Sequence, residues 1–502
     1  MFALFRRQSS GRLIAIGFAL LILLGSVILM LPWCLRNDVS LRYIDALYTS
    51  ASAVCVTGLT VVDTADTFTP LGQAVVGLLI QAGGLGVATV GAGIMLAMGR
   101  RVDLKGRTVL REAMNLSGDG GVVRLLKKVL TITAAFELTG AILSFPIFAQ
   151  NYPVLKAVEV SLFHSIAAFN NSGFDILGGM RNLIPYQHSL LLNLVTCGLI
   201  FFGGIGFPVM SELAEKRFRW KKLSMHTRVV LSVSSILLIA GALLIKLTED
   251  ISWLGAVFFS FSARTAGFST YPLGGFTKSG LCVVMMLMFI GASPGSTGGG
   301  IKTTTFFAIL QGIKSAATNR SEKAFHYSLP PEAFRKAVII ALMGLGIIGV
   351  GTYLLCILEP NIPFLDILFE AVSAFGTVGL STGITPSLGT ASKLLSIMIM
   401  YIGRLGPMTI ATLWYFNKGE GVRYPQGNIS IGWKLFRPYS CGRYTCLQRN
   451  ARGIPSLTVL LVWGALGRLW LWSWPLPMRR SWSWIGKKKK CACCGTIPKM
   501  PM

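Results

Sequence analysis

The sequence predicts an all-α, polytopic membrane protein built from four similar units. Hydrophobic residues make up 53% of the 502 residues and charged residues 13%, with a mean hydropathy of +0.62, which is typical of helical membrane proteins. Eight long apolar segments lie at about 13–32, 72–98, 126–148, 188–211, 228–247, 280–310, 336–358 and 391–415. A short glycine-containing stretch falls between the two apolar segments of each successive pair. These observations together predict a fourfold repeat.

The four stretches share one pattern. Each has a glycine followed by Leu or Phe and then a small or acidic polar residue, and a small residue stands five positions before the glycine. They are Val54–Thr60, Phe169–Asp175, Ala263–Ser269 and Phe375–Ser381. Each follows an apolar segment of about three helical turns, too short to cross a bilayer. We therefore expect four re-entrant pore helices, each followed by an extended strand, between eight transmembrane helices.

The second helix of each unit also contains a glycine cluster. The clusters are Gly83-Gly84-Leu85-Gly86, Gly203-Gly204-Ile205-Gly206, Gly291 to Gly295 and Gly403-Arg404-Leu405-Gly406. Glycine inside a helix costs about 1 kcal/mol relative to alanine, so these clusters need a reason. Two remain open: close approach of neighbouring helices and a bend. Unit boundaries are expected at 1–115, 116–223, 224–327 and 328–432.

Basic residues predict the orientation. They crowd three loops, around residues 100–128, 216–228 and 314–336. By the positive-inside rule these loops are cytoplasmic, which places both termini inside and accounts for much of the +27 formal charge without nucleic acid. The apolar run after Arg6, Arg7 and Arg12 is long enough to remain as a span.

The four strands suit a dehydrated cation. Backbone carbonyls from converging segments can replace the water of an ion, and glycine permits the backbone conformation that this requires. The expected selectivity filter is Thr57, Gly58, Leu59, Ser172, Gly173, Phe174, Ala266, Gly267, Phe268, Val378, Gly379 and Leu380, with potassium at the carbonyls of Thr57, Ser172, Ala266 and Val378. All four strands share one glycine position, where tetrameric potassium channels carry Gly-Tyr-Gly. We therefore expect potassium selection with looser discrimination against sodium.

The sixth apolar segment predicts a gate. The run from Gly291 to Gly300 contains a proline, five glycines and three hydroxyl residues, so it cannot stay helical. The expected gate residues are Gly295, Ser296, Thr297, Gly298, Gly299, Gly300, Lys302 and Arg404. A nucleotide phosphate loop is a weaker interpretation, because the required spacing is missing.

Arg404 stands in the middle of the eighth apolar segment, where an arginine needs partners. Three interpretations remain open. The guanidinium donates to carbonyls of the loop at 295–300 and holds the gate closed, it repels cations below the filter, or it pairs with an acidic residue on another helix.

These motifs resemble the Ktr/Trk/HKT superfamily of potassium transporters, most closely the bacterial Ktr-type membrane subunit, over about residues 10–430. The resemblance implies four membrane–pore–membrane units around a pseudo-fourfold axis and a homodimer in the bacterial plasma membrane. It also implies a cytoplasmic ring of nucleotide-binding regulatory subunits of the RCK type. No cofactor is expected in this subunit; the transported ion is expected to be potassium, with sodium as the other candidate.

The tail at 433–502 departs from that family. It holds 13 Lys or Arg, no Asp or Glu, and seven of the eleven tryptophans. Its Cys491-Ala492-Cys493-Cys494 run lacks a second ligand pair for a metal. In a frame shifted by one base, Val462 to Gly467 can spell a dinucleotide-binding glycine motif with an Asp at position 485. Our hypothesis is that the tail is an out-of-frame translation of a neighbouring gene, and we expect it to be unstructured.

Two other functional classes are less consistent with the sequence. A sodium-coupled solute carrier also uses broken helices, but four pore units argue against it. A membrane enzyme lacks support, because His164, His188, His226 and His326 form no catalytic constellation in the sequence.

Overall fold

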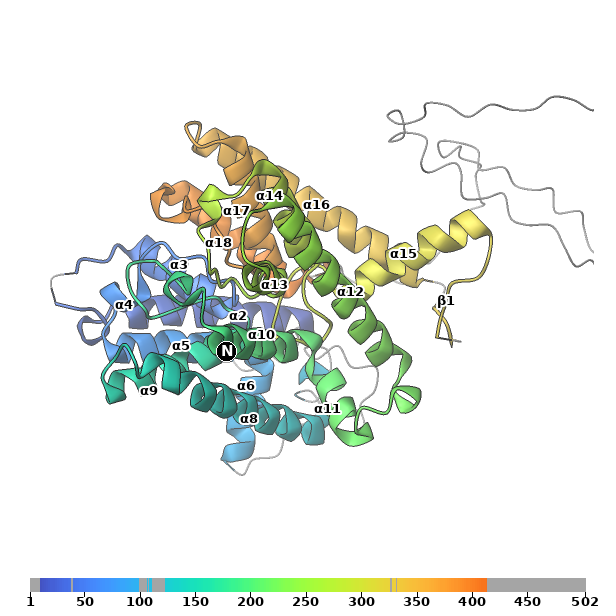
Figure 1. Ribbon diagram of the computed structural model, residues 1–502, viewed down its shortest axis with the longest axis horizontal. Helices are drawn as coiled ribbons and strands as arrows, with labels where there is room; N and C mark the ends of the chain where they lie inside the picture. The colour runs from blue at the N-terminus through green and yellow to red at the C-terminus, as the bar shows by residue number, and fades with distance from the viewer. Residues whose placement is uncertain are drawn as a thin grey trace, which may run out of the picture. The chain divides into compact units, whose positions relative to one another are not determined.

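The structure is a computed structural model that describes residues 10–37, 39–98, 106, 108–110, 122–325, 327–330 and 332–412. These residues belong to one compact unit, and most of them are helical (Figure 1). The tail at 433–502 lies outside the described residues, as do the expected unit boundaries at 115 and 432.

The fourfold repeat is confirmed by two sets of helices. The first helix of each unit is long and apolar enough to cross a membrane: α2 (Ser10–Leu29), α8 (Val122–Phe148), α12 (Met225–Thr248) and α16 (Ala333–Leu358). Each is followed by a shorter pore helix: α3 (Tyr43–Val54), α9 (Val154–Phe169), α13 (Trp253–Ser262) and α17 (Phe364–Gly376).

The second helices are all interrupted. They form the pairs α5 (Pro70–Leu85) and α6 (Val87–Ala97), α10 (Leu190–Ile205) and α11 (Phe207–Lys216), α14 (Lys278–Phe289) and α15 (Thr303–Thr318), and α18 (Thr390–Leu405) and α19 (Pro407–Thr412). The first two pairs are bent by 100° at Gly86 and Gly206, where φ is +86° and +94°. Gly406 has the same conformation, with φ +86°.

The bend that the sequence left open for the glycine clusters is therefore present at Gly86 and Gly206, and the break in the sixth segment is confirmed. Among the described residues, four helices are long and apolar enough to cross a membrane. The number rises to as many as six if each bent pair is counted as one span. Gly86 and Gly206 have a positive φ, a conformation that L-residues avoid. The bends therefore occur at glycine positions.

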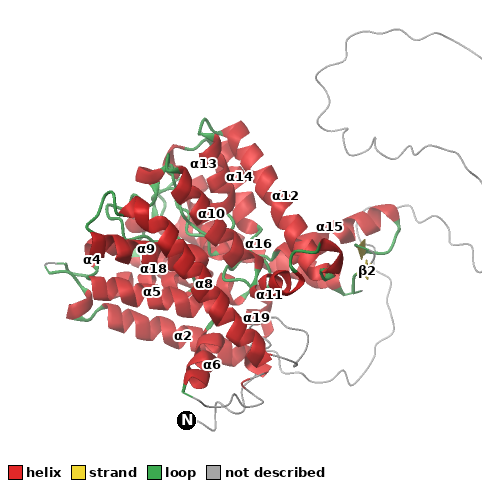
Figure 2. Cartoon of the chain, turned by 60° about the horizontal axis from the view of Figure 1, so that its bottom comes forward, coloured by secondary structure: helices red, strands yellow, loops and turns green. Residues whose placement is uncertain are grey.

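Short elements join these helices. They are α4 (Thr64–Thr67), the 3-10 turns η1 (Pro32–Cys34), η2 (Ile184–Tyr186), η3 (Trp220–Lys222), η4 (Leu273–Gly275) and η5 (Thr385–Ser387), and the strands β1 (Lys323–Ala324) and β2 (Tyr327–Ser328). The strands form an antiparallel hairpin between α15 and α16, at one edge of the described unit (Figure 2). The expected boundary at 327 falls within this hairpin.

The four units pack in a closed cycle. Each second helix contacts the pore helix of the following unit, in the pairs α5–α9, α10–α13, α14–α17 and α18–α3. The last pair joins the end of the described chain to its beginning, so the orange and blue helices are neighbours (Figure 1). Lys393 of α18 and Asp45 of α3 form a buried ion pair there, 2.7 Å from Nζ to Oδ1. This cycle positions four pore helices around one axis.

Candidate ion pathway

The glycines of the four strands form a closed ring. The space that a Cβ on each glycine would occupy is filled by the next strand, with the nearest carbonyl oxygen 2.1 to 2.8 Å away. The successive pairs are Gly58 with the Ser172 oxygen, Gly173 with Ala266, Gly267 with Val378, and Gly379 with Thr57. The structure thus brings together all four strands that the sequence singled out, in the order of the chain.

The strands share an unusual backbone. The ring glycines have φ between +70° and +94°, and the residue two positions before each glycine is also left-handed, with φ between +49° and +75°. Those residues are Val56, Asn171, Thr265 and Thr377. L-residues rarely adopt this conformation, which costs about 1–2 kcal/mol each. Its occurrence at the same place in four strands indicates a constrained, repeated geometry.

The amide groups of the strands are turned toward the pore helices. Each residue before a ring glycine donates its N–H to a carbonyl in the last turn of its own pore helix, at 2.8 to 3.0 Å: Thr57 to Ser52, Ser172 to Ala167, Ala266 to Ser262, and Val378 to Ser373. Within the described residues, no hydrogen bond reaches the carbonyl oxygens of these same four residues. The buried hydroxyls of Thr57 and Ser172 also lack a partner there. The ring therefore presents oxygen atoms that the protein itself does not use.

The pore helices favour a positive charge at the ring. All four end within five residues of their glycines, and a helix C-terminus carries about half a negative charge. The residues after the glycines, Leu59, Phe174, Phe268 and Leu380, are buried in the apolar core. Their side chains therefore pack in the core, and the polar atoms of the ring come from the main chain.

The loop between α14 and α15 lies against three units. Thr297 Oγ1 donates to the carbonyls of Phe169 (3.3 Å) and Gly203 (3.2 Å) in the second unit. The amide of Gly299 donates to Thr377 Oγ1 at 3.1 Å in the fourth. A Cβ on Gly298 would lie 2.2 Å from Thr265 Oγ1 in the third. The loop thus touches the ring strands directly, on the side of the pore helices.

Two cations hold this loop. Lys302 Nζ donates to the carbonyls of Gly298 (2.6 Å) and Gly299 (3.4 Å). Arg404 donates to the Thr297 carbonyl and to the carbonyls of Gly83 and Gly84. None of these Arg404 partners is a carboxylate, so the acidic-pair interpretation has no support among the described residues. The contact to Thr297 is the one expected of an arginine that donates to the loop.

The glycine clusters of the second helices serve close packing as well as bending. A Cβ on Gly83, Gly203 or Gly403 would lie 1.9 to 2.1 Å from a carbonyl oxygen at the end of the same unit's pore helix. Both explanations left open by the sequence therefore apply, at different glycines of one cluster.

Two buried polar groups near the ring, Arg264 and the cluster around Asn170, were not predicted from the sequence. Arg264, 8% exposed, donates to Ser234 (3.3 Å to Oγ) and to the Gly291 carbonyl at 3.5 Å, where the loop begins. In the second unit, Asn170 Nδ2 joins Gln81 Oε1 (2.6 Å) and Glu137 Oε1 (3.1 Å). Arg264 and Glu137 are ionisable and buried, and Glu137 lies in a helix that can span the membrane, so the rule that drew attention to Arg404 applies to both.

Comparisons with known proteins agree with this architecture. The family model TrkH, described as "Cation transport protein", matches residues 21–232 and 223–419. The chain is 38% identical over 440 residues to "Ktr system potassium uptake protein B" of Bacillus subtilis, covering 85% of this chain and 97% of the relative. It is 36% identical over 445 residues to "Potassium/sodium uptake protein NtpJ" of Enterococcus hirae, covering 85% and 98%. The fold is similar to the crystal structure of the potassium transporter TrkH from Vibrio parahaemolyticus, with a TM-score of 0.64, 18% identity, and coverage of 82% and 86%.

Proposed function

The chain belongs to the TrkH family of cation transport proteins, and from this premise we propose that it takes up potassium ions through the ring of its four glycine strands. As a member of this family it is a membrane transporter and not an enzyme.

One observation carries the proposal: four carbonyl oxygens gather in a ring while the amides of the same residues are bonded outward. In such a ring, oxygens held by a rigid frame replace the hydration shell of an ion. We assign the ion ligands to the carbonyls of Thr57, Ser172, Ala266 and Val378. The four helix C-termini stabilise a cation at this position and disfavour an anion.

We propose potassium as the preferred ion, with sodium discriminated less strictly than in tetrameric potassium channels. Two similar relatives are named for potassium uptake and for potassium/sodium uptake. A single ring of shared glycines offers fewer equivalent sites than a longer filter would. Sodium-coupled solute transport is the alternative; in that case uptake of another solute would depend on sodium, which the experiment below tests.

We propose that residues 295–300, with Lys302 and Arg404, form the gate. The loop lies directly against Thr265 and Thr377, two residues before the ring glycines. Its own carbonyls are occupied by Lys302 and Arg404, which also place positive charge below the ring. In this arrangement the loop obstructs the path, and conduction requires that it move.

The subunit is proposed to act in the bacterial plasma membrane, with both termini in the cytoplasm, as the positive-inside rule requires. We propose a homodimer and a cytoplasmic nucleotide-binding ring as its partners. The names of several relatives refer to a Ktr system, which agrees with a separate regulatory subunit.

Potassium uptake in a strain that lacks its own uptake systems tests this function. We expect the unchanged chain to support growth at low potassium, and Gly58→Ser and Gly267→Ser to lose the preference for potassium over sodium, because each side chain would collide with a carbonyl oxygen of the next strand. Gly349→Ser in α16 is the matched control, since a Cβ there meets no atom within 4 Å. Unchanged selectivity in both ring variants would contradict the proposal. Sodium-dependent uptake of an organic solute without potassium uptake would favour the alternative.

A further inference from the structure

A basic pocket lies far from the ring, between the first turns of α8 and the last turns of α11. Its volume is about 470 Å³, and its lining includes Arg124, Lys127, Lys128, Thr131 and Glu215. Because α8 is one of the helices that can span the membrane, the pocket lies at one end of a span, where lipid headgroups are found.

The pocket has more positive than negative charge. Lys128 and Glu215 form an ion pair, and Ser211 Oγ lies 3.5 Å from the same carboxylate. Arg124 and Lys127 are exposed and form no ion pair within the described residues. Two cations one helical turn apart therefore line the cavity, and neither is paired with an acidic residue in the part of the chain that the structure describes.

An apolar stripe continues from the pocket along the same helix. Leu138 and Ile142 follow Lys127 and Thr131 at helical spacing and are 58% and 70% exposed. Exposed apolar side chains of this kind on a membrane-spanning helix face acyl chains. A charged recess and an apolar stripe thus adjoin on one element, as the two ends of a phospholipid require.

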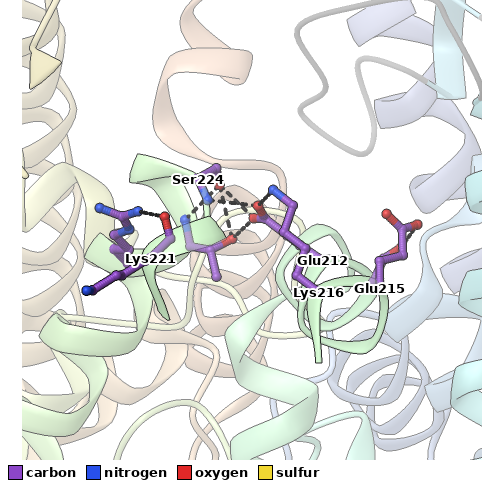
Figure 3. A network of polar contacts seen from close by, with 8 residues as sticks. Glu212, Glu215, Lys216, Lys221 and Ser224 are labelled. Carbon is purple, nitrogen blue, oxygen red and sulfur yellow. Dashed lines mark hydrogen bonds and ion pairs between the residues drawn. The ribbon is translucent and has the colours of Figure 1, made fainter. Parts of the chain in front are cut away.

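The opposite wall of the pocket is held in place. Glu212 of α11 accepts hydrogen bonds from Lys216 Nζ (2.6 Å), the Ser224 amide (2.8 Å) and Ser224 Oγ (2.6 Å), which fix α11 to the start of α12 (Figure 3). Glu215 is turned away from this cluster (Figure 3). One wall of the pocket is therefore a helix that hydrogen bonds fix to the start of α12.

We propose that this pocket binds the headgroup of an anionic phospholipid, with the phosphate at Arg124 and Lys127 and an acyl chain along Leu138 and Ile142. Basic pockets between membrane helices recognise such headgroups, at about 1 kcal/mol per cation. The proposal requires the membrane location of the chain but neither its ion selectivity nor its gate. A soluble phosphate or an acidic protein partner would use the cations but not the apolar stripe.

Binding of phosphatidylglycerol by the full-length protein tests the proposal. The protein is placed in nanodiscs of phosphatidylcholine with a titrated fraction of phosphatidylglycerol, and retained lipid is counted by native mass spectrometry. For Arg124→Gln with Lys127→Gln we expect about thirtyfold weaker retention, from two lost cations. The control, Lys221→Gln with Lys222→Gln, removes the same charge from exposed residues outside the pocket and should change retention less than about twofold.

A gain-of-affinity variant guards against loss through misfolding. Glu215→Gln frees Lys128 from its ion pair and should increase phosphatidylglycerol retention about fivefold, as expected for one additional available cation, which an unfolded protein would not do. Equal losses in the pocket and control pairs would overturn the proposal, because binding would then follow overall charge. Displacement of the lipid by millimolar inorganic phosphate, or no change in any variant, would also overturn it.

Discussion

Gly379 and Gly383 provide a direct test of the ring, because both have a positive φ but differ in surroundings. Their φ values are +94° and +103°. A Cβ on Gly379 would lie 2.1 Å from the Thr57 oxygen and 2.9 Å from the Gly58 Cα, whereas a Cβ on Gly383 meets nothing within 4 Å. Alanine at either position therefore incurs a similar conformational cost of about 1–2 kcal/mol, but only Gly379→Ala displaces a ring oxygen.

The displacement is large compared with the tolerance of an ion site. To relieve the contact, the Thr57 oxygen must move by about 1 Å, since non-bonded atoms repel steeply below their usual separation. We expect the preference for potassium over sodium to fall by at least about tenfold in Gly379→Ala, equivalent to about 1.4 kcal/mol. In Gly383→Ala the preference should stay within about twofold of the unchanged protein.

Two measurements on the same reconstituted protein distinguish these effects. Potassium flux into proteoliposomes at increasing sodium reports selectivity. The thermal midpoint reports the loss of stability, which should be larger in Gly379→Ala because the clash with the next strand adds to the conformational cost. The ring hypothesis fails if both variants lose selectivity to the same extent, because backbone strain alone would then explain the loss. It also fails if Gly379→Ala remains fully selective.

Three further predictions concern the loop and the closure of the ring. Arg404→Ala removes the donor to three carbonyls and should raise basal potassium flux several-fold; a lower flux would contradict a role in closing the gate. Thr377→Val removes the oxygen that accepts the Gly299 amide at 3.1 Å, and the loss of this hydrogen bond costs about 1–3 kcal/mol. Hydrogen exchange at that amide should therefore accelerate about fivefold or more; unchanged exchange would refute the contact. Lys393→Met removes one of the two basic partners of buried Asp45, which keeps its ion pair with Arg42, and should lower the free energy of unfolding by about 1–3 kcal/mol. Addition of Asp45→Asn should restore at least half of the loss; additive losses would show that the pair does not hold the units together.

The repeat explains why so much of the ring could be predicted from the sequence. The four strands recur with a glycine in the same local context, and pseudo-symmetry then places the equivalent residues around one axis. The polarity of the site could also be anticipated, since the main chain supplies the oxygens and the side chains of Leu59, Phe174, Phe268 and Leu380 only pack. A repeated spacing of residues is therefore sufficient to predict a site that is built from the main chain.

The third strand shows where spacing alone misleads. By spacing, Ser262 is equivalent to Ala53, Ala168 and Ala374, because each stands five residues before a strand glycine. In the structure, the carbonyl of Ser262 accepts a hydrogen bond from the amide of Ala266, the residue before Gly267. The equivalent acceptors in the first and fourth units are Ser52 and Ser373, which lie six residues, and not five, before their glycines. The amide in the third strand therefore bonds to a carbonyl one residue nearer its glycine, although α13 itself ends five residues before that glycine and the other pore helices end three or four residues before theirs.

Long-range partners could not be predicted for a different reason. Arg404 was identified as costly in a membrane, but its acceptors come from segments more than 100 residues away in the chain. Arg264 received no role because it lies in a filter strand and not in a long apolar segment. A local pattern contains no information on which distant carbonyls will be left unbonded, and these carbonyls determine what a buried guanidinium contacts.

The distribution of the loop's contacts determines how such a gate can open. The loop bonds to the second unit through Thr297 and to the fourth through Gly299, and Arg404 connects it to the carbonyls of Gly83 and Gly84 in the first. Displacing the loop breaks several bonds that together are worth about 3–5 kcal/mol, at about 1 kcal/mol each. A spontaneous opening would then be populated at about one molecule in a thousand. A regulator that holds the open state must therefore bind it more tightly than the closed state, by a free energy of about 3–5 kcal/mol. The free energy of displacing this loop thus sets how strongly the proposed partner must discriminate between the two states.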